Sequence, residues 1–176
     1  SVASRGLGDV YKRQLVANPE FLSEGNGLTD FFYPDRIIIG TSSEKAKEIM
    51  QSLYDPIVKR QVSWLQNEPI SSMKSAVPVI YTDLNSAQMI KYASNAFLAT
   101  RISFINEIAE MCESLDANCK EVAQGMGYDS RIGHKYLNAG LGFGGPCLEK
   151  DLKALINIAK STNVTSNQEE NVSRNM

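Results

Sequence analysis

The pattern of apolar and polar positions differs between the two halves of the chain. In the first half it predicts short strands and a helix between them. Strands are predicted at Leu15–Ala17 and Arg36–Gly40. The run Ile37–Ile39 is continuous and β-branched, which is typical of a strand buried on both faces of a parallel sheet. A further strand is predicted at Val77–Tyr81, where Pro78 indicates an edge or a strand start.

A helix is predicted between the last two of these strands. The segment Thr41–Ser43 offers N-caps, and the helix continues to about Lys59. Its apolar residues recur at spacings of three and four and therefore form one buried stripe. They are Ala46, Ile49, Met50, Leu53 and Ile57. The order strand, helix, strand predicts a parallel α/β fold.

The second half is dominated by one long helix. From about Asn85 to Leu115 the sequence has neither Pro nor Gly, so roughly thirty residues continue as one helix of ~45 Å. Such a length is typical of a spine or of an oligomer contact. Asn118 and Glu121 have the spacing of a capping box for a shorter helix, and another helix is predicted at about 148–159.

Composition and charge exclude several functional classes. The 176 residues carry a net charge of −2 with both signs interspersed, which argues against a nucleic-acid partner or a polybasic membrane surface. No apolar run approaches the ~20 residues of a spanning helix, and no secretion segment opens the chain. The three cysteines then predict free thiols in a reducing compartment, which makes a cytoplasmic protein the expectation.

The stretch Gly140–Asp151 carries the strongest candidate chemistry. Cys147 follows Pro146 at the start of a predicted helix, where the helix dipole and free N–H groups stabilise a thiolate. Lys150 and Asp151 follow at i+3 and i+4 and so share a helix face with the thiol. A nucleophile beside an acid/base group and a cation is typical of covalent catalysis. The alternative is a buried cysteine at a helix cap, and spacing alone does not decide between the two.

Two further segments offer catalytic groups. Lys91 and Asn95 are one turn apart on the long helix, where they either hold an oxyanion in a dry pocket or form a solvated stripe. The loop Asn18–Gly25 follows a predicted strand, at the edge of a parallel sheet where ligands bind. Its Glu20 and Glu24 are candidates for a general base and a helper, and a plain helix-initiating turn is the alternative.

Four other residues were weighed for chemistry. Arg131 is a candidate ligand for an anion or a sugar, and the alternative is a surface arginine. His134 is expected to be a bystander, and no metal site is expected. Cys112 and Cys119 are seven residues apart with no histidine nearby, so structural roles are predicted for both.

Taken together, these motifs resemble the UDP-glucose/GDP-mannose dehydrogenase family, most of all its UDP-glucose 6-dehydrogenases. The resemblance covers about residues 15–160, and the loop that leads to Cys147 is its most specific signal. The matching segments are Asn18–Gly25, Pro34–Gly40, Lys91–Asn95, Asn106–Glu107, Arg131–Gly133 and Gly142–Cys147 with Lys150–Asp151.

The resemblance implies NAD-dependent, four-electron oxidation of the C6 alcohol of a UDP-sugar, from UDP-glucose to UDP-glucuronate. Cys147 would form a thiohemiacetal and then a thioester with the sugar. Lys91 and Asn95 would stabilise the C6 oxygen, Asp151 would position or activate water, and Glu24 would assist proton transfer.

Binding roles are also implied by the resemblance. The backbone after Glu20 would hold the nucleotide sugar, and Glu24 and Lys150 would lie near the NAD cofactor. Residues expected to bind the substrate are Glu20, Phe21, Leu22, Ser23, Arg131, Tyr136, Asn138 and Gly144. In related enzymes the arginine is supplied across a dimer, which implies a homodimer through the long central helix.

The expected fold class is an α/β fragment, in which the end of a Rossmann-like parallel sheet precedes an all-α central domain. Residues 1–14 show no clear period and are expected to be a non-native leader. Residues 15–83 would be the C-terminal part of the NAD-binding domain, and residues 84–160 a central helical dimerisation and catalytic domain. Residues 161–176 are expected to be a truncated tail.

The chain also departs from the family pattern. Glu149 stands where many relatives have proline, which adds charge near Cys147. No Gly-x-Gly-x-x-Gly dinucleotide-binding loop is expected anywhere in the chain. The first half of the NAD-binding domain and the C-terminal domain are therefore expected to be missing, and the chain alone is expected to be inactive.

Other functions remain open at this point. A sibling enzyme would act on GDP-mannose or on a UDP-N-acetylhexosamine. The β-hydroxyacid dehydrogenases share a Lys-x-x-x-Asn helix but need no counterpart of Cys147. A third possibility is an inactive helical dimerisation fragment.

Overall fold

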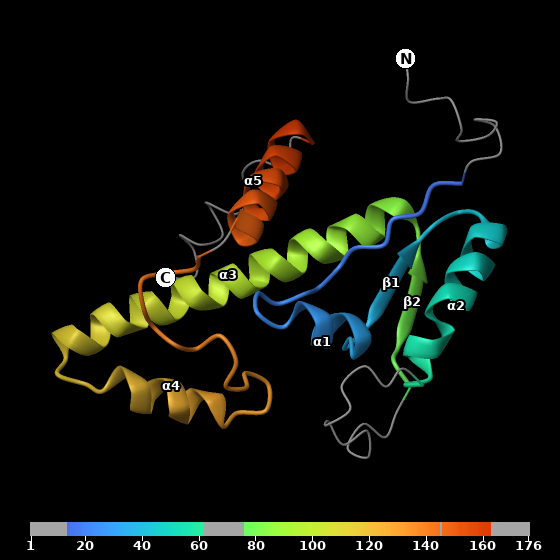
Figure 1. Cartoon of the computed structure of the whole chain (residues 1–176). Helices are drawn as coiled ribbons and strands as arrows, with labels where there is room; N and C mark the ends of the chain where they lie inside the picture. Colours follow the sequence, from blue (N-terminus) through green and yellow to red (C-terminus); the bar gives the residue numbers. More distant parts are fainter. Residues whose placement is uncertain (1–13, 62–75, 145, 163–176) are drawn as a thin grey trace. The chain divides into compact units, whose positions relative to one another are not determined.

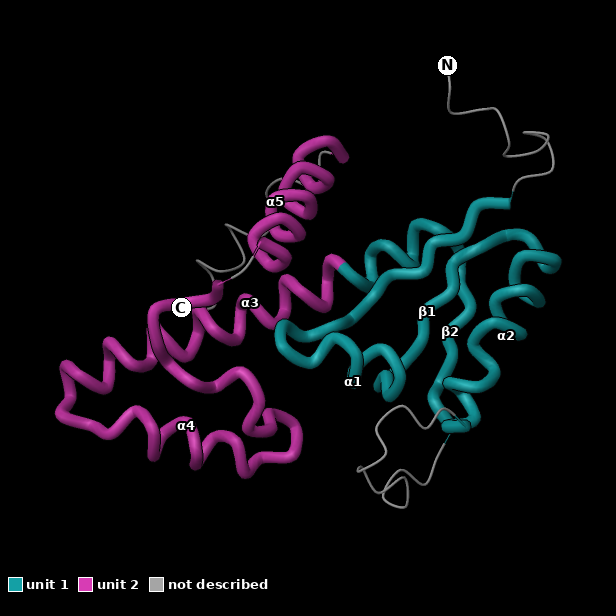
Figure 2. Tube along the Cα trace, in the orientation of Figure 1, with its two compact units in different colours: residues 1–91 teal, residues 92–176 magenta. Residues whose placement is uncertain are grey.

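The computed structural model describes residues 14–61, 76–144 and 146–162 of the chain (Figure 1). The chain divides into two compact units, residues 1–91 and 92–176, and the boundary falls inside the longest helix (Figure 2). The leader expected at 1–14 lies outside the described residues apart from Gln14. The tail expected at 161–176 lies outside them apart from Ser161 and Thr162.

The first unit is built on two short parallel strands, β1 (Ile37–Gly40) and β2 (Val79–Thr82). They pair in register over all four residues, which confirms the predicted parallel arrangement. Between them in the sequence is α2 (Glu44–Val58), whose N-cap Ser43 accepts a backbone N–H at 3.3 Å. β2 begins directly after Pro78, which agrees with the strand start that was one of the two alternatives predicted for this proline.

The core of this unit lies between the strands and α2. β1 is buried at each of its positions, as its continuous β-branched run predicted. Ile37 and Ile39 pack with Ile57 of α2 and with Val77, which precedes β2. Burying one such aliphatic side chain is worth about 1.5–3 kcal/mol, so even this small cluster contributes several kcal/mol to the unit.

Two local expectations were wrong or incomplete in the first unit. The predicted strand at Leu15–Ala17 is wrong, because only Ala17 makes an isolated antiparallel bridge, with two 2.8 Å hydrogen bonds to Gly40. The chain cannot continue this ladder far, since Pro19 has no N–H to donate. A short helix that the sequence did not reveal, α1 (Gly27–Phe32), follows the loop and buries no residue.

The second unit is helical. The long helix α3 (Leu84–Ser114) begins in the first unit and continues through the second, which confirms the prediction of one element of this length. α4 (Cys119–Gly127) is capped by Asn118, whose Oδ1 accepts a backbone N–H at 3.0 Å. α5 (Pro146–Ser161) begins earlier than predicted, so Cys147 lies within its first turn.

Within the second unit, α3 has a buried and an exposed side. Its buried apolar residues there are Ala99, Ile105 and Cys112. Large exposed side chains recur every seven residues, at Phe97, Phe104 and Met111. Among the helices that the structure describes, none combines the length and the apolar character needed to cross a lipid bilayer.

Candidate active site

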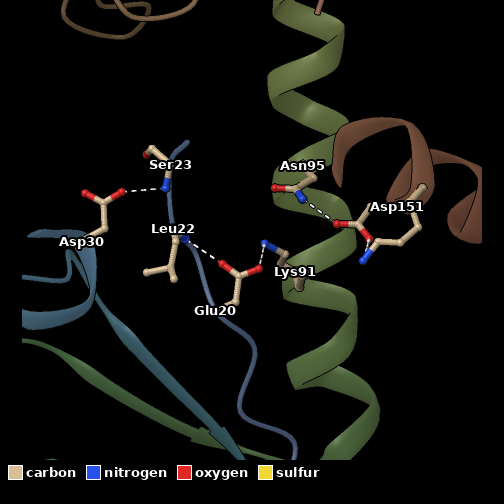
Figure 3. A network of polar contacts seen from close by, with 8 residues as sticks. Glu20, Leu22, Ser23, Asp30, Lys91, Asn95 and Asp151 are labelled. Carbon is tan, nitrogen blue, oxygen red and sulfur yellow. Dashed lines mark hydrogen bonds and ion pairs between the residues drawn. The ribbon is translucent and has the colours of Figure 1, made fainter. Parts of the chain in front are cut away.

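The loop of residues 18–25 is held by carboxylates that accept its own backbone N–H groups. Glu20 Oε2 accepts the Leu22 N–H at 2.7 Å, and Asp30 Oδ2 accepts the Ser23 N–H at 2.7 Å (Figure 3). Asp30 belongs to α1, so the helix missed by sequence reasoning fastens this loop. Two of the N–H groups expected to face a nucleotide sugar therefore have internal acceptors.

Lys91 points into this loop rather than into solvent. Its Nζ lies 3.2 Å from Glu20 Oε1, and its side chain is only 16% exposed, which excludes the solvated stripe as an interpretation (Figure 3). The ring of Phe21 lies 5.4 Å from Lys91 Nζ and 3.9 Å from the guanidinium carbon of Arg36. Phe21, expected to bind substrate, thus contacts two cations through its ring face. The sequence placed Arg36 in a predicted strand and in a motif, but neither pattern predicts its contact with Phe21.

The start of the same loop is tied to both β1 and α2. Asn18 Nδ2 donates to the Ile38 carbonyl at 2.8 Å, and the Tyr54 hydroxyl donates to Asn18 Oδ1 at 2.5 Å. Asn18 was recognised from its motif, but Tyr54 lies 36 residues away and no local pattern marked it. The loop that carries Glu20 is therefore anchored at its beginning by side chains.

In the second unit, Asn95 and Asp151 form a buried pair. Asn95 Nδ2 donates to Asp151 Oδ2 at 2.6 Å, and the two residues are 8% and 2% exposed (Figure 3). Lys150 Nζ lies 3.4 Å from Asp151 Oδ1, although its own side chain is 72% exposed. A carboxylate buried to this degree needs donors, and the amide of Asn95 supplies the short one.

Cys147 is exposed, so the structure excludes the buried cap residue that was the alternative interpretation. It is the second residue of α5, after Pro146. Asp151, four residues later, is buried, so the thiol and the carboxylate have different surroundings despite their helical spacing. An accessible sulfur at a helix N-terminus is suited to attack on an electrophilic carbon.

The glycine-rich segment before Cys147 is fixed at its start by α3. Asn106 Oδ1 accepts the Gly140 N–H at 2.8 Å, which gives a structural reason for the asparagine in this motif. Gly142 has a φ of +106°, a conformation that side chains other than glycine rarely adopt. Gly144, an expected substrate contact, is exposed, and the space beside its Cα is open.

Arg131 projects from a turn after α4, and its side chain is 88% exposed. Its guanidinium pairs with Asp129, with Nη2 at 2.6 Å from Oδ2. Hydrogen bonds from Arg131 lower the pKa of the Asp129 carboxyl below its ordinary value, and the same pair raises the pKa of Arg131. Tyr136 and Asn138 are exposed beyond this turn, and Tyr136 has a φ of +61°.

The other candidates fall into two groups. Glu24 is exposed, and its carboxylate has no hydrogen-bond partner among the described residues. Cys112 is buried, and desolvation raises the pKa of its thiol, with a smaller contribution from neighbouring Cys119. That environment fits the structural role expected of it. No cluster of possible metal ligands occurs in the part of the chain that the structure describes.

Comparison with known proteins identifies relatives for both units. A model of the UDP-glucose/GDP-mannose dehydrogenase family, central domain, matches residues 85–175. A model of the same family, NAD binding domain, matches residues 3–58. Among solved structures, a UDP-glucose dehydrogenase from Pyrobaculum islandicum has a TM-score of 0.72 and 37% identity, covering 85% of this chain and 31% of that chain.

Curated relatives agree with these matches. The UDP-glucose 6-dehydrogenase TuaD of Bacillus subtilis is 46% identical over 161 residues, which are 92% of this chain and 31% of TuaD. The UDP-glucose 6-dehydrogenase of Rickettsia typhi is 43% identical over 147 residues, 84% of this chain and 30% of that protein. The chain therefore spans only about 30% of the length of these curated relatives.

Proposed function

The chain belongs to the UDP-glucose/GDP-mannose dehydrogenase family, and on that premise we propose that it supplies the reacting cysteine of an NAD-dependent nucleotide-sugar 6-dehydrogenase. The observation that carries this proposal is an accessible thiol, Cys147, on the helix whose Asp151 is buried against Asn95. Relatives named UDP-glucose 6-dehydrogenase support UDP-glucose as the substrate. Because the chain spans about 30% of their length, the activity is proposed for a full-length protein that contains these residues.

The proposed reaction converts a primary alcohol into a carboxylate in two oxidations. One UDP-glucose, two NAD⁺ and one water give one UDP-glucuronate, two NADH and three protons. When bound, NAD⁺ would supply the hydride acceptor for C6 in both oxidations. Between the two oxidations, Cys147 Sγ adds to the C6 aldehyde and gives a thiohemiacetal. Loss of the second hydride leaves a thioester, and water then releases the carboxylate and regenerates the thiol.

A thiol suits this sequence for a physical reason. The thiohemiacetal keeps the aldehyde bound to the protein and provides a C–H bond whose carbon carries both oxygen and sulfur. A hydroxyl in the same place would be a much weaker nucleophile near neutral pH. The accessibility of Cys147 supports this role.

Lys91 and Asn95 are proposed to stabilise the C6 oxygen as negative charge develops there. Lys91 is held by Glu20 and by the ring of Phe21, so its ammonium is positioned before the reaction begins. Asn95 is fixed by its bond to Asp151, and its Nδ2 carries a second hydrogen for a ligand oxygen. We propose that Asp151 orients the hydrolytic water and that the exposed Glu24 assists proton transfer.

The residues proposed to hold NAD are Glu24 and Lys150. Both are exposed, and a carboxylate and an ammonium can hydrogen-bond the hydroxyl and amide groups of a dinucleotide. The glycines at 140, 142 and 145 have the letter spacing of a dinucleotide-binding loop, but the residues described before Gly140 form no strand. That segment does not fit a phosphate-binding loop, so the match to an NAD binding domain at residues 3–58 carries the cofactor proposal.

We propose that the full-length protein is a homodimer that uses α3 and works in the cytoplasm. The side chains that recur every seven residues on α3, Phe97, Phe104 and Met111, are exposed and could pack against a second copy. Three free cysteines fit a reducing compartment. Sedimentation of the full-length protein tests the dimer, and a monomer would contradict it.

The proposed function is tested in a full-length hybrid in which residues 15–160 replace the matching segment of TuaD. The parent hybrid should form two NADH for each UDP-glucose consumed, and little or none with GDP-mannose. Cys147→Ser should lower uronate formation by at least about 10³-fold, since catalytic residues act together and loss of the nucleophile disables the whole set. Cys119→Ser is the matched control, because Cys119 also begins a helix, and it should retain activity. A Cys147→Ser hybrid that makes uronate at the parental rate would contradict the mechanism.

A further inference from the structure

The turn that carries Arg131 is closed by hydrogen bonds of its own. The Asp129 carbonyl accepts the N–H groups of Ile132 and Gly133, each at 2.9 Å. Asp129 Oδ1 accepts the Arg131 N–H at 2.9 Å. Gly133 completes the turn with a φ of +70°. The backbone path from residue 129 to residue 133 is therefore fixed locally, but these bonds alone do not fix its orientation on the unit.

Arg101 of α3 supplies the missing attachment. Its Nη1 donates to the Ile132 carbonyl at 2.9 Å and its Nη2 to the Gly133 carbonyl at 3.0 Å. The two terminal nitrogens of arginine lie in one rigid plane, so they can donate to two successive carbonyls at once. The single ammonium of a lysine does not have this geometry. Arg101 Nε is buried and has no hydrogen-bond partner among the described residues. The two terminal nitrogens of the guanidinium are thus placed to donate to the turn, even though its Nε–H is left unpaired among the described residues.

Arg131 itself is presented outward by this arrangement. Its Nε and Nη2 are bound by the Asp129 carboxylate, at 3.0 and 2.6 Å. Its Nη1 makes no hydrogen bond among the described residues and remains available to another acceptor. The side chain is therefore oriented before any ligand arrives.

We propose that Arg101 is a positioning residue for the nucleotide sugar, because it fixes the turn from which Arg131 offers its free guanidinium edge to an anionic oxygen. This inference rests on the proposed function, in which Arg131 binds the substrate. Arg101 does not touch the substrate. It acts through Arg131, so its effect must disappear when Arg131 is already removed.

The first test measures steady-state kinetics of the full-length TuaD hybrid with Arg101→Lys, Arg131→Gln and both changes together. Arg101→Lys should raise KM for UDP-glucose at least tenfold and change kcat less than threefold, because binding is lost equally in ground and transition states. The double variant should have the same KM as Arg131→Gln alone, within twofold. If the increases in KM of the two single variants multiply in the double variant, the proposal is overturned.

A matched control and a second variant keep the kinetic test decisive. Arg60→Lys is the control, because Arg60 also donates to a backbone carbonyl, that of Pro34, but far from this turn in the sequence. It should leave KM unchanged, and an equal rise in KM would overturn the proposal. If the hybrid with Arg101→Lys does not fold, Gly133→Ala disturbs the same turn at its positive φ and should raise KM in the same way.

The second test needs no activity and uses the 176-residue chain itself. Trypsin should cleave after Arg131 at least tenfold faster in Arg101→Lys than in the parent, because a released turn opens more often. Arg60→Lys should cleave there at the parental rate. Equal rates in all three chains would overturn the proposal. A parent hybrid that fails to oxidise UDP-glucose would instead contradict the proposed function, while the cleavage rates still decide the role of Arg101.

Discussion

Replacing Asn95 with alanine should destabilise the chain more than any single change at the exposed surface of α5. Asp151 is 2% exposed, and among the residues that the structure describes it has two polar partners, Asn95 at 2.6 Å and Lys150 at 3.4 Å. Lys150 is largely exposed, so solvent screens its interaction and it contributes at most about 1 kcal/mol. The bond from Asn95 is therefore the one that compensates the burial of the carboxylate.

Asn95→Ala removes that bond and leaves a buried oxygen with only a screened cation nearby. The expected loss is about 2–3 kcal/mol in the free energy of unfolding, since a bond to a charged group is lost and its acceptor stays buried. This corresponds to a roughly 30- to 160-fold change in the unfolding equilibrium constant. Lys150→Ala, the control, should cost less than about 1 kcal/mol.

Urea unfolding of the 176-residue chain, followed by circular dichroism of its helices, measures both losses. The double variant Asn95→Ala/Asp151→Ala should lose less unfolding free energy than the sum of the losses in Asn95→Ala and in Asp151→Ala, because neither buried partner is then left alone. If Asn95→Ala costs no more than Lys150→Ala, the buried pair does not stabilise the unit as described. Strict additivity in the double variant would refute the direct coupling of the two side chains.

Three further predictions concern other parts of the chain. Gly40→Ala should cost about 1–3 kcal/mol in urea unfolding, because its new Cβ would lie 2.5 Å from Ala87 Cβ, while Gly27→Ala, with open space, should cost far less. Hydrogen bonds from Ser86 lower the pKa of Asp83 in the folded chain. This carboxylate therefore stabilises the chain above its unfolded pKa, and the stabilisation is lost as the pH falls through the folded pKa. The difference between the urea midpoints at pH 7 and pH 3 should therefore be smaller in Ser86→Ala than in the parent chain. The purified 176-residue chain should form no NADH from UDP-glucose and NAD⁺, and measurable formation would contradict the expectation that it is inactive alone.

The elements that the sequence predicted well are those whose apolar pattern is long or continuous. β1 follows from a run of three isoleucines, and α3 follows from a long stretch without Pro or Gly. The strand expected at Leu15–Ala17 failed because three residues do not determine a pairing partner. α1 was missed because its six residues bury nothing, so its apolar positions carry no helical signal.

The site shows the same division between local pattern and distant contact. Motifs pointed to Glu20, Lys91 and Asp151 by residue type, because the proposed chemistry uses such groups. Other groups that hold the loop and the turn of this site in place came from elsewhere in the chain. Tyr54 reaches Asn18 across 36 residues, and Arg101 reaches the turn after Arg131 across 31 or 32. Such partners are selected by tertiary packing, which no spacing rule encodes.

The length of α3 has a physical consequence within the second unit. Asn95, Arg101 and Asn106 each hold a different downstream segment, namely Asp151, the carbonyls of residues 132 and 133, and the N–H of residue 140. At 1.5 Å per residue, the first and last of these anchors are about 16 Å apart along the axis. All three lie in the interior of the helix, where backbone hydrogen bonds continue on both sides and fraying is least. A rigid rod of this length can therefore fix the relative positions of the helix that carries Cys147, the glycine-rich segment before it and the turn that carries Arg131.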